Sequence, residues 1–338
     1  MRIHLWALSL LLISVLGCAA GEVLRILPAC EGSGKGKHIV LISGDEEYRS
    51  EETCPMLAKI LSVHHGFETT VLFAINPETG VINPQIQNNI PGLEALQTAD
   101  LVILNTRFRK LPPEQLKHIA DYVNTGKPLI GLRTATHAFR CGTQTHGIDW
   151  NNFGLNFLGE RWVAHHGKHK VEGARGVIVE EQAQHPILRG VEDIFAPSDV
   201  YTVKHLDEAK ATVLVRAAIT ETMEPDSRVL QEDPRNHPLQ AGIWLHGYTA
   251  PNGTRGTSLL STMGASVDFE SEDLRRVIVN AVYHLLDLEV PEKANVNYVD
   301  PFEPTFFSFL PKAYWEERQL KPADFGLGKS PSVGLPSQ

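Results

Sequence analysis

The sequence predicts an α/β fold with a flavodoxin-like, doubly wound parallel sheet, and three observations carry this prediction. Short apolar runs alternate with stretches of helical periodicity from residue 38 onward, which is the pattern of a parallel sheet. Glycine, proline or asparagine bounds each run, as expected for buried strands. Charged and polar residues gather directly after three of the runs, where open α/β sheets bind ligands. The chain of 338 residues is 42% hydrophobic and can bury a large core.

The first half of the chain alternates regularly. We predict strands at His38–Ser43, Phe67–Ala74, Ala99–Asn105 and from Lys127 to Leu132. Between them we predict a helix that has Ser50 as its N-cap and ends at Gly66, a short helical turn at Leu93–Gln97, and a helix from Pro112 to Asn124 closed by Gly126. Glu51 and Glu52 suit the first turn of the first helix, because they face the positive end of its dipole.

The second half is less regular. Three further strands are expected, at Val177–Val179, Asp199–Val203 and Ala211–Ala217. A late hairpin follows over a Pro-Asn-Gly turn, pairing Ala241–His246 with Thr257–Thr262. An amphipathic helix is expected at Leu274–Asp287, before a Pro-rich stretch that we expect to run extended over the surface.

The organisation of the chain follows from these elements. Residues 1–20 are expected to be a signal peptide, because a short apolar stretch follows Arg2 and His4. Two kinds of processing remain possible. The signal peptide is cleaved after Ala20, or it is a lipoprotein signal and lipid is attached to Cys18, which would anchor the protein in the membrane. Both kinds of processing predict an exported protein, either periplasmic or lipid-anchored at the bacterial cell envelope. Residues 21–37 form a leader, residues 38–290 the α/β domain and residues 291–338 the Pro-rich extension.

Charge and cysteine content narrow the function classes. The formal net charge of -9 argues against nucleic-acid binding. Cys54 and Cys141 follow neighbouring strand exits, so they are expected either to form a disulfide or to remain two buried thiols. The sequence leaves the oligomeric state open. No phosphate-loop or dinucleotide fingerprint follows the first strand, so we expect no nucleotide cofactor.

Three strand exits should face one crevice and form a candidate ligand site. Arginines recognise oxygen-rich ligands with planar, multiple donors, and carboxylates accept hydroxyl groups, so the set suits a sugar or sugar acid. An internal salt-bridge network that locks the loops is the structural alternative. As substrate-binding residues we predict Arg49, Arg107, Arg109, Arg133 and Thr134, with Tyr201 from a later strand; as catalytic residues we predict Asp45, Glu46, His137 and His165.

A histidine cluster is the second candidate site. His165, His166 and His169 are spaced so that they can line one loop, and with His137 they could hold a divalent metal such as zinc. The alternative is a loop of metal-free histidines that bind a ligand or one another. A nucleophile is missing, because Arg133 stands where a strand-to-helix elbow would present Cys or Ser, and Cys141 lies further on.

Several short motifs follow one another along most of residues 38 to 288. They are Lys127–Leu132, Leu158–Glu160 with His165, His185–Gly190, Asp199–Tyr201, Ser261–Ala265 and Asn280–Tyr283, with the stretches Gly44–Arg49 and Arg133–Phe139. Through these motifs the chain resembles the ThuA-like (trehalose utilisation) family, which is similar to the class I glutamine amidotransferases in its flavodoxin-like sheet. With the last two stretches it resembles exported members of the type abundant in planctomycete-like bacteria.

The resemblance implies carbohydrate metabolism, with a disaccharide or keto-sugar as substrate. Many members have a histidine where Arg133 stands and Gly-His where Gly264-Ala265 stands, and the amidotransferase cysteine aligns with Arg133, so glutaminase activity is not implied. We expect an enzyme that uses acid/base chemistry, with or without a metal, as a lyase, isomerase or hydrolase acting on a sugar, keto-sugar or glycoside. The alternative is a non-catalytic carbohydrate-binding or scaffold module at the cell surface.

Overall fold

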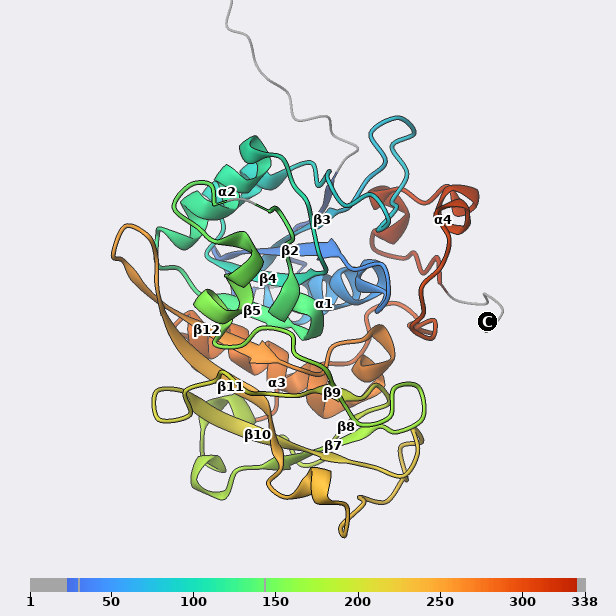
Figure 1. The fold of residues 1–338 in the computed structure, drawn as a ribbon. Coiled ribbons are helices and arrows are strands. Elements are labelled where there is room, and N and C mark those ends of the chain that lie inside the picture. The colour runs from blue at the N-terminus through green and yellow to red at the C-terminus, as the bar shows by residue number, and fades with distance from the viewer. Residues whose placement is uncertain (1–22, 30, 143, 333–338) are drawn as a thin grey trace, which may run out of the picture.

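A mixed β-sheet forms the centre of the molecule (Figure 1). The computed structural model describes residues 23–29, 31–142 and 144–332, so the expected signal peptide, Cys18 and Cys30 lie outside the described residues. Among these residues the main sheet has ten strands in the order β1-β3-β2-β4-β5-β12-β11-β10-β7-β8. In that order they are Val23–Ile26, Glu68–Phe73, His38–Gly44, Leu101–Thr106, Leu129–Leu132, Arg255–Ser261, Gln240–Thr249, Thr212–Ile219, Ala174–Ile178 and Ile194–Ala196.

The middle of the sheet is parallel and the rest is antiparallel. Strands β3, β2, β4, β5 and β12 pair in parallel. Strand β1 pairs antiparallel with β3 at one edge, and β11, β10, β7 and β8 continue antiparallel beyond β12. A separate pair joins β6 (His165–His166) to β9 (Val200–Tyr201). The predicted α/β class with a parallel central sheet is therefore confirmed, and the predicted late hairpin is β11–β12.

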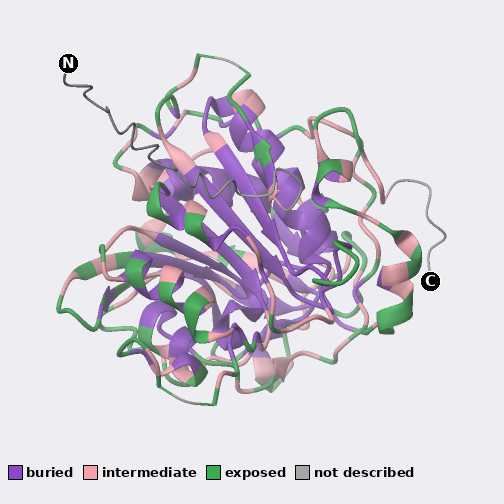
Figure 2. Cartoon of the chain, turned by 90° about the horizontal axis from the view of Figure 1, so that it is seen from above, coloured by how far each residue is buried: buried purple, intermediate pink, exposed green. Residues whose placement is uncertain are grey.

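Helices cover both faces of the sheet. Helices α1 (Ser50–His65) and α3 (Glu272–Leu285) pack on one face. Helix α2 (Pro113–Val123) covers the other face with the turn at 150–158. The last helix, α4 (Lys312–Arg318), lies in the C-terminal extension beside the loops that follow β3. Figure 2 shows the strands as the most deeply buried part of the molecule. Among the described residues no helix is long and apolar enough to cross a membrane.

Two sequence expectations differ from the structure. Ser50 is the first residue of α1 and not its cap: its hydroxyl accepts from the Asp45 amide and pairs with Ser43, while Arg49 holds the cap position at φ 62°. The extension after Pro291 includes α4 and a short 3₁₀ turn at Pro322–Phe325, where only an extended chain was expected. Cys54 is buried and Cys141 is half-buried. Both are free thiols, so of the two expectations the structure has two thiols and no Cys54–Cys141 disulfide.

The parallel strands align three exits at one edge. The chain leaves β2 at Asp45, β4 at Arg107 and β5 at Arg133. Each exit holds a non-glycine residue at positive φ: Arg49 at 62°, Phe108 at 48° and Arg133 at 41°. Such conformations cost about 1–3 kcal/mol each and persist where surrounding contacts impose them. Of these three residues, Phe108 lines the pocket described below, Arg133 lies behind it, and Arg49 turns toward the C-terminal extension.

Candidate functional site

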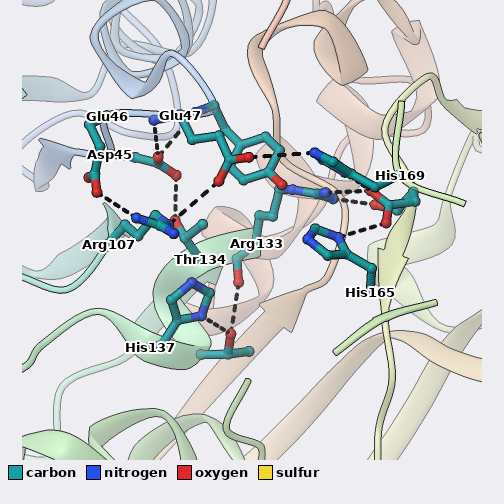
Figure 3. A network of polar contacts seen from close by, with 12 residues as sticks. Asp45, Glu46, Glu47, Arg107, Arg133, Thr134, His137, His165 and His169 are labelled. Atoms are coloured by element: carbon teal, nitrogen blue, oxygen red, sulfur yellow. Dashed lines mark hydrogen bonds and ion pairs between the residues drawn. The ribbon is translucent and has the colours of Figure 1, made fainter. Parts of the chain in front are cut away.

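Asp45 anchors the turn after β2. Its Oδ1 accepts from the amides of Glu47 at 2.8 Å and Tyr48 at 3.0 Å, and its Oδ2 accepts from the Thr134 hydroxyl at 2.6 Å (Figure 3). The side chain is fully buried. Burial, with the neighbouring Glu46 carboxylate, raises the pKa of Asp45 to about 6. Asp45 therefore joins the exits of β2 and β5 beneath the site and holds Glu47 and Tyr48 in place.

Glu46 joins the exit of β2 to the exit of β4. Its two carboxylate oxygens accept from Arg107 at 2.5 Å and from Arg109 at 2.7 Å. Arg109 is fully buried and also donates to the carbonyls of Pro84, Ile86 and Arg107. Removing one partner from such a buried pair costs more than the pair itself contributes. Glu46 and Arg109 therefore form a structural clamp, which leaves Arg107 as the half-buried arginine of this group.

Arg133 occupies the centre of the site and is fully buried. Its guanidinium donates to the Asp199 side chain at 3.0 Å, to the Asp199 carbonyl, to Ser198 at 2.9 Å and to the Thr262 carbonyl. It lies between two tyrosine rings, with centroids 4.1 Å (Tyr48) and 4.7 Å (Tyr201) away. Because both faces and most donors are used, Arg133 organises the site from behind and does not reach a ligand directly.

Asp199 receives two imidazoles as well as Arg133. His169 Nδ1 lies 3.0 Å from Asp199 Oδ1, and His165 Nδ1 lies 2.7 Å from Asp199 Oδ2, at a poorer angle than a regular hydrogen bond requires. Burial by itself would raise the pKa of Asp199, but the two histidines and Arg133 together hold it well below its usual range. Figure 3 shows both rings meeting this carboxylate. Asp199 is thus a permanent anion that fixes His165 and His169.

His169 is held between two carboxylates, Asp199 and Glu47, the latter with Oε1 3.5 Å from His169 Nε2. These hydrogen bonds raise the pKa of His169 to about 9. A pKa above the unfolded value of about 6.5 means that the stabilisation is complete below pH 6.5 and is lost as the pH rises through 9.

We expect His169→Gln to lower the free energy of unfolding by about 1–2 kcal/mol at pH 6, a figure reduced for solvent screening of a partly exposed pair. The difference from the wild type should shrink between pH 6.5 and 9, because the wild type then loses its charged imidazole. Urea unfolding at pH 6, 8 and 10 measures it. His118→Gln on α2 is the control, since no ion pair of that ring occurs among the described residues. A difference independent of pH would refute the charge assignment.

His137 is a neutral imidazole. Burial lowers its pKa well below the ordinary value, and the charges of Arg107 and Arg133 lower it further. Thr136 Oγ1 lies 2.9 Å from His137 Nδ1 and donates its own proton to the Arg133 carbonyl. Both contacts are satisfied together when the hydroxyl accepts from Nδ1–H, and this tautomer leaves the lone pair of His137 on Nε2. In this tautomer the unprotonated Nε2 is available as a hydrogen-bond acceptor or as a base.

A small pocket lies where these groups meet. Its cavity volume is about 40 Å³, and the wall is made by Glu47, Tyr48, Arg107, Phe108, His137, Trp162, His165 and Tyr201. The Tyr48 hydroxyl is buried and has no hydrogen-bond partner. Burial raises the pKa of Tyr48, so this hydroxyl stays protonated. Larger hollows occur elsewhere on the molecule, but among the described residues this pocket combines two imidazoles with an arginine and a tyrosine.

The residues that could bind a divalent metal in the structure differ from the set His165, His166 and His169 that was expected from the sequence. His165, His169 and Asp199 place ligand atoms within 4.8 Å of one another. His166 alternates to the opposite side of β6, so it does not join this group. Burial lowers the pKa of His166. Asp199, which the sequence presents as one carboxylate on a later strand, joins in its place. Arg133 already balances its charge, which weakens the set as a cation site.

The predicted site residues fall into three groups. The pocket brings together His137, His165, Arg107 and Tyr201, with Glu47, Tyr48, Phe108 and Trp162, which the sequence did not single out. Asp45, Glu46, Arg109, Arg133 and Thr134 lie behind the pocket wall in polar networks. Arg49 points away from the pocket, to Thr305, Tyr314 and Trp315 of the C-terminal extension. Sequence signals for the missed residues were the position of Trp162 three residues before His165 and the place of Glu47, Tyr48 and Phe108 within the strand exits.

The fold and the site together define a class of α/β protein with a ligand pocket at the carboxyl edge of its parallel strands. The chain belongs to the ThuA family, whose description is trehalose utilisation, because the family model matches residues 40–285. A putative ThuA-like protein from Parabacteroides merdae is similar in structure, with TM-score 0.51 and 14% identity, over 83% of this chain and 99% of that one.

Other solved structures are more distant. A cytoplasmic protein from Salmonella typhimurium has TM-score 0.44 and 14% identity over 75% of this chain and 99% of its own. The glutaminase domain of a Trypanosoma brucei CTPS has TM-score 0.36 and 12% identity over 77% and 98%. The likeness to the Parabacteroides merdae protein bears on the fold alone, and the two lower TM-scores support no inference about this chain. No curated protein matches the chain significantly.

Proposed function

We propose that the protein is an enzyme that moves protons on a sugar, with a keto-sugar or keto-glycoside as the substrate class. The observation that carries this proposal is that two imidazoles, His137 and His165, line one pocket. His137 lies near the guanidinium charges of Arg107 and Arg133, and His165 Nδ1 lies 2.7 Å from the Asp199 carboxylate. Two imidazoles beside one substrate can act as base and acid in a proton transfer. The family description points to carbohydrates.

His137 is the base in this proposal. His137 lines the pocket, and in the tautomer that donates Nδ1–H to Thr136 the lone pair is on Nε2. Removal of a proton from the carbon beside a carbonyl requires an unprotonated base, and the lowered pKa keeps His137 unprotonated. His165 is the partner that returns a proton. Asp199 fixes its Nδ1, so Nε2 is the nitrogen left for the substrate.

The remaining wall binds and orients the substrate. Arg107 is the cation of the pocket lining and donates to sugar oxygens or to a carbonyl oxygen that gains negative charge. The Tyr48 hydroxyl supplies a further donor. Aromatic rings at Phe108, Trp162 and Tyr201 suit the C–H face of a pyranose. The pocket has about 40 Å³, room for only one or two waters, so its wall must open to admit a sugar ring.

Two alternative functions would use the residues of this site in different ways. A carbohydrate-binding module would use Arg107, Tyr48 and the aromatic rings and would turn nothing over. A metal enzyme would hold a divalent ion at His165, His169 and Asp199, where it would polarise a carbonyl. The buried Arg133–Asp199 pair favours the metal-free arrangement, because that carboxylate is already neutralised.

One experiment separates the three. The purified protein is incubated with a panel of keto-glucosides and keto-disaccharides, before and after treatment with a chelator, and released sugars are followed by chromatography. We expect turnover that survives chelation. Binding without turnover would support the binding module. Activity lost on chelation and restored by zinc would establish the metal enzyme.

A further inference from the structure

The C-terminal extension is hydrogen-bonded to the loop that carries Glu47 and Tyr48. The Ser308 amide donates to the Glu47 carbonyl at 3.0 Å. Thr305 donates to both carboxylate oxygens of Glu52, at 2.7 and 2.9 Å, and its hydroxyl accepts from Arg49 at 2.5 Å. These contacts join residues more than 250 positions apart and fix the backbone of 305–308 against the site.

Two phenylalanines of this segment take different positions. Phe307 is fully buried and packs on Tyr48 at 5.2 Å and on His169 at 5.5 Å between ring centroids. Phe309 is 55% exposed, although its ring covers the Arg107 guanidinium at 4.8 Å. The Gln85 side chain holds the next residue through the Leu310 carbonyl at 2.9 Å. A large apolar ring is therefore presented to solvent by a backbone that is tied down on both sides.

Trp162 is an exposed aromatic residue of the pocket lining itself. It is 40% exposed, and its ring lies 5.6 Å from His137 and 6.2 Å from His165. Among the described residues the exposed Trp and Phe side chains are Trp162, Phe306 and Phe309, and all three belong to this region, since Phe306 stacks on Phe307. Exposed aromatic rings gathered at a polar pocket are typical of a binding surface.

We infer that Phe309 and Trp162 form an outer subsite for the second sugar ring of a disaccharide whose first ring reaches the His137–His165 pocket. The inference rests on the proposed function and names its substrate more narrowly. Sugar rings pack their C–H faces on aromatic rings, and Arg107 and Glu47 provide polar groups for hydroxyls at the same edge. The pocket itself is too small for two rings. Residues 305–309 lie outside the region matched by the family model, so this wall is added by the extension.

The test compares Phe309→Ala with the wild type in the binding of two probes, a methyl keto-glucoside and keto-cellobiose oxidised at the same ring carbon. Dissociation constants come from calorimetry. We expect the wild type to bind the disaccharide about 10-fold more tightly, and Phe309→Ala to lose this preference while its affinity for the methyl glucoside stays unchanged. Phe309→Trp should keep the preference. Leu327→Ala is the matched control, since Leu327 is an exposed apolar residue (48%) of the same extension and does not line the pocket.

The outcomes distinguish the subsite from the function beneath it. If both probes bind equally well and Phe309→Ala changes neither, the subsite is refuted and the proposed function stands. If neither probe binds the wild type, the proposed function fails and the subsite fails with it. Phe309 is exposed, so its replacement should leave the fold intact, which a thermal melt verifies.

Discussion

Asp199→Asn is expected to lower kcat/KM on the keto-sugar substrate by about 10³–10⁴-fold while the protein remains folded. The asparagine keeps the size of the side chain and one oxygen for Arg133, but it removes the negative charge and the second acceptor. His165 then loses the partner that fixes its Nδ1–H tautomer. A carboxylate in this role contributes about four orders of magnitude in enzymes that depend on a His–Asp pair.

The measurement pairs steady-state kinetics with thermal unfolding. Asp226→Asn is the control, since Asp226 is exposed and distant from the pocket lining. His165→Gln should produce a loss of similar size, and the double variant should be little worse than either single one, because the two residues act as a unit. A kcat/KM within threefold of the wild type for Asp199→Asn would exclude the pair from the chemistry.

Arg133→Met should lower the free energy of unfolding by about 3–5 kcal/mol, the cost of leaving a buried carboxylate without its partner. Arg133 is fully buried, pairs with Asp199 and lies between Tyr48 and Tyr201, so methionine fills part of the volume but replaces none of the charge. Denaturant unfolding at neutral pH measures the change.

The control for Arg133→Met is Arg255→Met on β12, where the side chain is exposed and a change within about 0.5 kcal/mol is expected. Lowering the pH should shrink the deficit of Arg133→Met, because protonation removes the uncompensated charge of Asp199. A decrease in the free energy of unfolding below 1 kcal/mol would contradict this prediction. It would mean that the buried network around Arg133 positions the site residues but does not stabilise the fold.

Much of the fold was predictable because the parallel strands are continuous apolar runs. The β2 run is bounded by turn residues and buried along its length, and the Pro-Asn-Gly turn between β11 and β12 has a specific chemistry. Ser50 shows the limit. A serine before acidic residues predicts a cap, but tertiary contacts with Ser43 and Asp45 take its hydroxyl. The local sequence pattern does not show that other residues compete with the helix N-terminus for the Ser50 hydroxyl.

The location of the site could be predicted from the sequence, but the identity of the residues that line it could be predicted only in part. Strand order puts Arg107, Arg133 and His137 at one edge. Which of the arginines meets solvent depends on partners distant in sequence: Arg109 is covered by Glu46 and two carbonyls, and Arg49 by the C-terminal extension. Asp199 gained its role because β9 pairs with β6, an association of two-residue strands that no periodicity reveals.

The hydrogen bond between Ser308 and Glu47 has a consequence for shortened forms of the protein. The segment that makes this bond also belongs to the packed interior, because Val296, Phe307 and Phe325 are buried core residues. A product that stops near residue 290 would therefore lack part of the hydrophobic core as well as one wall of the site. Selectivity and stability are linked in this protein through the same C-terminal stretch.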